Sequence, residues 1–112
     1  MNMSPAHIVN LAAAVAPPED GIISRTIYND ERLKAVVFGF GSGQELSEHT
    51  ASLPAVMQFL SGVADVTLGG EKSAASAGTW VHMPAGMPPS ILGKTPLVMR
   101  LFCPKWGEDG GR

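Results

Sequence analysis

Short apolar stretches, broken by glycine and proline, run along most of the chain. Residues 63–68 alternate between apolar and polar side chains, the pattern of a half-buried β-strand. Stretches rich in Ile, Val, Thr and aromatic residues predict further strands, and Gly69 with Gly70 predicts a tight hairpin. The predicted strands cover residues 21–29, 33–40, 55–61, 63–68, 71–76, 78–83, 90–92 and 96–102, with residues 44–50 left ambiguous. About eight to ten short strands are typical of a sandwich or small barrel, and residues 10–16 predict at most two helical turns.

The composition is that of one folded domain. Apolar residues make up 45% of the 112 positions and charged residues 16%, which excludes a disordered chain. The 13 glycines and 9 prolines are too many for a helix bundle. A net charge of −2 with no basic run argues against a nucleic-acid partner.

No segment predicts export or a membrane span. Residues 8–16 are apolar, but the first basic residue, Arg25, follows them, so they do not form a signal peptide. No run reaches the ~18 apolar residues that a membrane helix needs. The single cysteine, Cys103, cannot form an internal disulfide and has no histidine near it in sequence to activate it. We therefore expect an incidental thiol and a cytoplasmic protein.

Two stretches, residues 43–62 and 78–89, carry a spacing that resembles the two sequence motifs of the cupin superfamily. The matching positions are Gly43, His49, Gly62, Gly78, Pro84 and Gly86. The resemblance implies an all-β double-stranded β-helix, the jelly roll of two packed antiparallel sheets, over residues 21–102. Residues 1–20 are then an extension that packs on or near this barrel, and residues 103–112 a flexible tail. The resemblance also implies a homodimer.

The positions that hold a metal ion in many cupins are largely replaced. The resemblance assigns two histidines and a glutamate to the first motif and a histidine to the second. Here these positions are His49, Ala51, Ala55 and Pro89, and three of the four have no side-chain donor atom. A catalytic metal site needs about three protein ligands, so we expect no cofactor.

A rebuilt metal site is the alternative. If His82 points inward, it meets His49, and the two form a weak site for a divalent transition metal such as Fe, Mn, Ni or Zn. Glu45 is a third ligand only if the strand between it and His49 is regular. If Val81 and Met83 point inward instead, no such site forms. Strand alternation allows either orientation, and the sequence does not decide between them.

The side chains that face the interior of the predicted barrel are the candidates for lining a pocket. Residues at the four metal-ligand positions share this face by the resemblance, and alternation along the strand that begins at Ala55 adds Met57 and Phe59. The predicted pocket residues are His49, Ala51, Ala55, Met57, Phe59, His82 and Pro89. On the last strand, Met99 and Phe102 have opposite parity, so only one of them shares the face.

Three functions follow from these expectations. The first is a metal-free barrel that binds a small molecule, with His49 as its polar handle. The second is a metal-dependent enzyme of the dioxygenase or isomerase type, built on His49 and His82. The third is a structural or interaction domain whose pocket is closed by Met57, Phe59 and Met83.

Overall fold

The computed structural model describes residues 5–47 and 53–105. One short 3-10 helix, η1 (Leu11–Ala13), precedes the strands. The strands of the described residues are β1 (Ile22–Asn29), β2 (Leu33–Phe40), β3 (Glu45–Ser47), β4 (Ala55–Ser61), β5 (Val63–Leu68), β6 (Glu71–Ser76), β7 (Trp80–Met83), β8 (Pro89–Gly93) and β9 (Leu97–Pro104).

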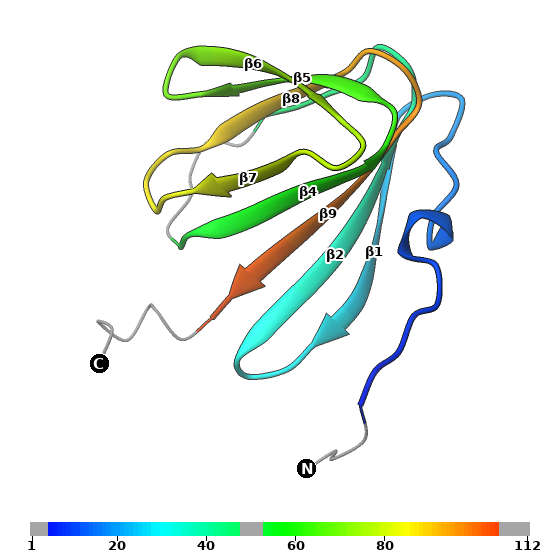
Figure 1. The fold of residues 1–112 in the computed structure, drawn as a ribbon, viewed down its shortest axis with the longest axis vertical. Helices are drawn as coiled ribbons and strands as arrows, with labels where there is room; N and C mark the ends of the chain where they lie inside the picture. Colours follow the sequence, from blue (N-terminus) through cyan, green and yellow to red (C-terminus); the bar gives the residue numbers. More distant parts are fainter. Residues whose placement is uncertain (1–4, 48–52, 106–112) are drawn as a thin grey trace.

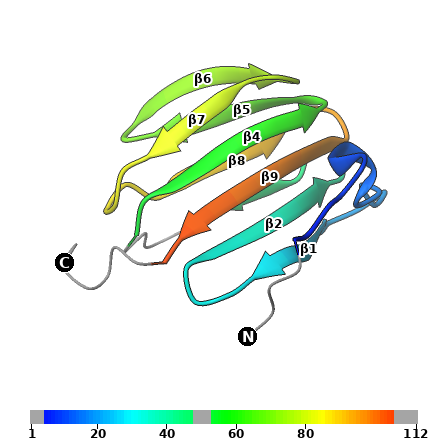
Figure 2. The same cartoon turned by 60° about the horizontal axis from the view of Figure 1, so that its bottom comes forward.

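The strands form two antiparallel sheets that pack face to face (Figures 1 and 2). One sheet has the order β1-β2-β9-β4-β7, and the other has the order β3-β8-β5-β6. This arrangement confirms the predicted jelly-roll fold of two packed sheets. The strand pairs of the described residues divide into these two sheets and do not join into one closed cylinder.

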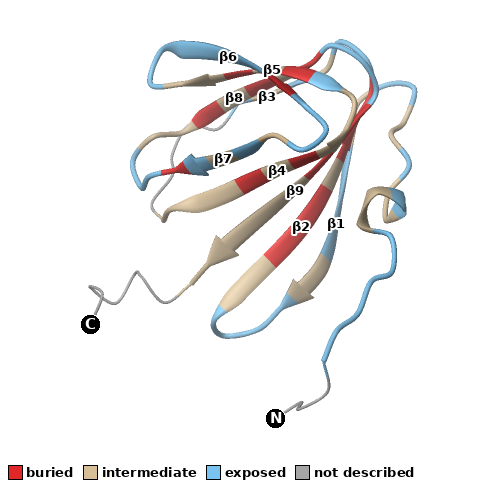
Figure 3. Cartoon of the chain, in the orientation of Figure 1, coloured by how far each residue is buried: buried red, intermediate tan, exposed pale blue. Residues whose placement is uncertain are grey.

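Alternation along each strand places one set of side chains between the sheets. Buried positions accordingly concentrate on the strands that face this interior (Figure 3). The five-stranded sheet contributes large side chains such as Phe40 and Phe59, and the four-stranded sheet contributes Val66 and Ile91. Burial of these apolar surfaces is the main force that holds the two sheets together.

The strand predictions agree closely with the structure. Residues 33–40, 55–61, 63–68 and 71–76 form strands with the predicted bounds. The ambiguous stretch 44–50 contributes the three-residue strand β3. The last strand continues beyond the predicted end at residue 102, so Cys103 belongs to β9 and not to a tail. The backbone N–H of Lys105 donates to the Arg32 carbonyl oxygen at 2.8 Å and fixes this end beside β2.

The described part of the N-terminal extension lies on the outer face of β1 and β2. The Arg25 guanidinium donates to the Ala14 carbonyl oxygen at 3.0 Å. A Cβ placed on Gly39 of β2 would contact Pro17 and Val15, so this stretch of chain lies directly on the sheet. No helix in the described ranges is long and apolar enough to cross a membrane.

Gly62, between β4 and β5, has no room for a side chain. Its φ of +86° lies in the left-handed region, and a Cβ there would overlap the Pro96 carbonyl oxygen. Gly70, in the β5–β6 hairpin, has a similar φ of +81° but nothing within 4 Å of such a Cβ. Alanine substitutions at these two glycines therefore distinguish the cost of backbone strain, present at both, from the cost of steric overlap, present only at Gly62.

We predict that Gly62→Ala lowers the free energy of unfolding more than Gly70→Ala does. The left-handed conformation alone costs about 1–2 kcal/mol for a residue with a Cβ, so Gly70→Ala should lose that amount. Gly62→Ala should lose more, because the chain near Pro96 must also move. Urea denaturation of both variants measures the difference, and equal losses would contradict the assigned packing of Gly62.

Candidate functional site

A cavity of about 230 Å³ lies between the two sheets. Its lining comes from both sheets and from the segment before β4. The lining residues are Phe38, Leu46, Leu53, Ala55, Met57, Met83, Pro89, Ile91, Met99, Leu101 and Cys103. Every one of these side chains is apolar except the Cys103 thiol, which is itself only a weak hydrogen-bond donor.

The position of β4 between β7 and β9 determines which side chains enter the cavity. Ala55 of β4 is paired with Met83 of β7. On the other side, Met57 is paired with Leu101 of β9, and the same register places Ala55 opposite Cys103. Directly opposite residues in an antiparallel pair project to the same face. The small Ala55 side chain therefore leaves open space between Met83 and Cys103.

The predicted pocket residues separate into three groups. Ala55, Met57 and Pro89 line the cavity. Phe59 is fully buried in the core but does not line the cavity. His49 and Ala51 lie outside the described residues.

His82 does not belong to the cavity, and this prediction was wrong. His82 is paired with Val56, whereas its neighbour Met83 is paired with the cavity residue Ala55. Because side chains alternate along β7, His82 points to the outer face of the five-stranded sheet, where it is exposed. The structure thus selects the second of the two possible orientations, with Val81 and Met83 inward.

Glu45 also lies away from the cavity. It accepts a hydrogen bond of 2.7 Å from the Ser90 hydroxyl on the neighbouring strand. The next residue, Leu46, lines the cavity, so alternation sends Glu45 to the opposite face. Neither His82 nor Glu45 can therefore complete a metal site inside the cavity.

The described residues that line the cavity do not fit a divalent ion held by nitrogen and oxygen ligands. Ala55 and Pro89, at two of the positions that hold ligands in many cupins, line the cavity without a donor atom. Within the residues that the structure describes, no three His, Cys, Asp or Glu side chains gather to form a metal centre. Uncompensated positive charge would also be costly against such an apolar wall.

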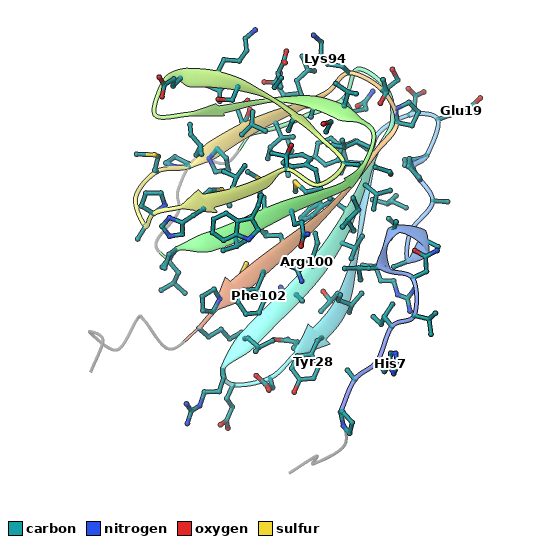
Figure 4. All side chains as sticks on the ribbon, in the orientation of Figure 1. His7, Glu19, Tyr28, Lys94, Arg100 and Phe102 are labelled. Atoms are coloured by element: carbon teal, nitrogen blue, oxygen red, sulfur yellow. The ribbon has the colours of Figure 1, made fainter. Side chains whose placement is uncertain are left out.

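Sequence reasoning missed the contribution of β9. Alternation along this strand brings Met99, Leu101 and Cys103 into the cavity together and sends Phe102 to the outer face, beside Arg100 (Figure 4). The signal was present in the sequence as the period of two, but it could be used only if the strand was known to continue through Cys103.

The environment of Cys103 favours the neutral thiol. Partial burial raises the pKa of this thiol, and the positive charge of Lys34 lowers it by a smaller amount. Lys34 is the pairing partner of Cys103 on β2. Since burial dominates, Cys103 is protonated at pH values at which an exposed cysteine begins to ionise.

Solved structures resemble this chain over nearly its whole length. A conserved protein of unknown function from Streptococcus pyogenes is 30% identical, and the match covers 94% of this chain and 92% of that chain, with a TM-score of 0.80. A cupin superfamily protein from Desulfitobacterium hafniense is 21% identical, over 93% of this chain and 95% of that chain, with a TM-score of 0.81.

An enzyme is among the more distant structural neighbours. Salicylate 1,2-dioxygenase from Pseudoaminobacter salicylatoxidans is 18% identical, with a TM-score of 0.70, over 81% of this chain but only 27% of that chain. At this identity the likeness concerns the fold alone. No protein-family model matches the chain, and no curated protein sequence matches it.

We predict that Cys103 reacts with iodoacetamide more slowly in the folded protein than in urea. The thiolate is the reacting form, and a raised pKa reduces its fraction at a given pH. The pH dependence of the rate should have its midpoint above that of the unfolded chain. Lys34→Met should raise this midpoint further, because it removes the one charge that favours the thiolate. Equal midpoints for folded and unfolded protein would contradict the burial of Cys103.

Proposed function

We propose that this chain is a member of the cupin superfamily and that it binds a small, uncharged, apolar molecule in the cavity between its two sheets without a divalent metal. The observation that carries this proposal is the lining of the cavity, in which Cys103 supplies the only polar side chain among the residues that the structure describes. Apolar walls favour apolar ligands, because binding removes both surfaces from water.

The volume of the cavity limits the ligand to roughly one ring with small substituents. A buried apolar cavity of about 150 Å³ is large enough for benzene, and the present cavity measures about 230 Å³. A ring the size of a phenylalanine side chain buries roughly 150–250 Å². At 25 cal/mol per Å² this burial contributes about 4–6 kcal/mol, which corresponds to a Kd between about 1 mM and tens of micromolar.

The charge of a ligand of this size should strongly affect its affinity for the cavity. An ionised carboxylate in the cavity loses its hydration, and the described lining offers neither a cation nor a strong hydrogen-bond donor in return. Binding of an anion is therefore much weaker than binding of its neutral, isosteric counterpart. The proposed ligand class is neutral and mostly hydrocarbon, with aromatic rings favoured by methionine sulfur contacts.

The two alternative functions have less support. A metal-dependent enzyme built on His49 and His82 would need His82 in the cavity, and His82 lies on the outer face. A closed, vestigial pocket would need the interior to be filled, and open space remains beside Met57 and Met83. His49 lies outside the described residues, so its role as polar handle stays a prediction, as does the cytoplasmic location.

We further propose a homodimer that forms through the outer face of the five-stranded sheet. Trp80 is 59% exposed on this face, next to the pair of Val56 and His82. Phe102 of β9 is paired with Val56 and lies on the same face, beside Arg100 (Figure 4). Tryptophan and other aromatic side chains are enriched in protein interfaces. The described N-terminal extension covers another part of this sheet, where it packs on β1 and β2 and its helix η1 approaches β4.

We predict that toluene binds to the metal-free protein and that benzoate binds at least about tenfold more weakly, because the carboxylate cannot be solvated in the cavity. Ligand-observed NMR measures both.

Ala55→Leu should abolish toluene binding by filling the cavity, whereas Ala77→Leu, the same change at an exposed turn, should leave it intact. His49→Ala should weaken binding of a ligand that carries a hydroxyl group. The proposal fails if Ala55→Leu binds toluene as well as wild type.

We predict that Trp80→Lys converts the dimer to a monomer, because it removes the large aromatic side chain at the proposed interface and buries a second positive charge near Arg100. Light scattering after size-exclusion chromatography gives the mass. Val63→Lys is the matched control, because Val63 is 42% exposed on the other sheet. A wild-type protein that is monomeric, or a variant that stays dimeric, would rule out this interface.

A further inference from the structure

Sulfur atoms are concentrated around one cavity. The chain has six methionines and one cysteine, and three of the methionines, Met57, Met83 and Met99, line the cavity together with Cys103. Ordinary core packing accounts for buried methionines one at a time. It does not explain why the only cysteine and half of the methionines face the same open space.

The strand register brings three of these side chains around Ala55. Met83 is paired with Ala55 on one side, and the register of β4 with β9 places Cys103 on the other. Neighbouring strands lie about 4.8 Å apart, so the Met83 and Cys103 backbones are separated by roughly 9.6 Å. Met57 follows Ala55 by two residues, about 6.6 Å along the same face.

The Ala55 methyl group leaves the space between these three side chains open. Each methionine places its sulfur two bonds beyond Cβ and has enough rotatable bonds to adapt its direction. Metal–sulfur bonds of about 2.3 Å then allow Met57, Met83 and Cys103 to meet at one ion above Ala55.

The sulfur ligands of Met57, Met83 and Cys103 favour some metal ions over others. Thiolate and thioether ligands are soft and favour Cu(I), whereas Fe(II), Mn(II) and Ni(II) favour nitrogen and oxygen ligands. The net charge of the bound site also favours Cu(I). Cu(I) bound to the Cys103 thiolate forms a neutral unit, and the thioethers of Met57 and Met83 add no charge. A divalent ion on the same ligands would keep a net positive charge inside an apolar cavity, which is unfavourable.

We propose that Met57, Met83 and Cys103 form a binding site for one Cu(I) ion between the two sheets. Binding replaces the thiol proton of Cys103 with the ion, and the proton passes to solvent. The ion would occupy the cavity proposed for an apolar ligand, but its binding does not require such a ligand.

Anaerobic titration of the reduced, full-length protein with Cu(I), in competition with bathocuproine disulfonate, tests the site. We expect one Cu(I) per chain, a sulfur-to-copper absorption band in the ultraviolet, and no comparable binding of Zn(II). Cys103→Ala should remove the band and the binding. Met57→Leu and Met83→Leu, which nearly conserve side-chain volume, should each weaken Cu(I) binding by about tenfold or more, since even the loss of an outer-shell partner of a metal ligand costs about 10–100-fold in affinity.

Two further methionines serve as controls. Met87 lies near Gly69 at the β5–β6 hairpin, and Met3 is in the N-terminal segment. Met87→Leu and Met3→Leu should bind Cu(I) as the wild type does.

Three results would overturn the proposal: complete loss of Cu(I) to the chelator, wild-type affinity in Cys103→Ala, or loss of binding in Met3→Leu. Toluene is titrated into metal-free protein, so failure of the copper site and failure of the apolar-ligand site are separate results.

Discussion

The pairing register of β4 with its two neighbours is the constraint on which the rest of the structure depends. In a β-sheet, a shift of one residue sends every side chain of a strand to the opposite face. The observed register pairs Met83 with Ala55 and Met57 with Leu101, so sulfur and hydrocarbon face the interior. A shift of β7 by one residue would bring His82 inside and expose Met83. The apolar character of the cavity is therefore a property of strand pairing as much as of composition.

The same register gives the outer face of the five-stranded sheet a different chemistry. Arg100 lies between the inward-facing Met99 and Leu101 and points outward, where its guanidinium donates to the Gln58 side chain at 2.9 Å. This bond crosses from β9 to β4 and pairs one N–H of a charged group that the interior could not accept, while the buried Arg100 Nε has no partner among the described residues. Trp80, paired with Gln58, is exposed beside it. One sheet thus separates a neutral interior from a mixed aromatic and polar exterior.

Local patterns in the sequence predicted the strands well, because period-two alternation and glycine or proline breaks act over a few residues. Four strands have the predicted bounds, and the fold class follows from them together with the motif spacing. The orientation of His82 could not be predicted, since it depends on pairing with Val56, a residue 26 positions earlier. Cys103 was missed for a related reason. Its strand ends only where pairing with β2 ends, and sequence shows no break at residue 102 or at residue 103.

The loss of nitrogen and oxygen donors does more than remove a metal site, because it changes the class of guest that the fold can hold. A cavity lined by imidazole and carboxylate groups stabilises charge, whereas the lining described here favours a guest that is neutral or becomes neutral on binding. A hydrocarbon satisfies this condition by its composition. A monovalent ion satisfies it by displacing the proton of the single thiol, Cys103, which burial already keeps in its neutral form. Electroneutrality therefore connects the apolar lining of the described residues, the raised pKa of Cys103 and the guests that we propose.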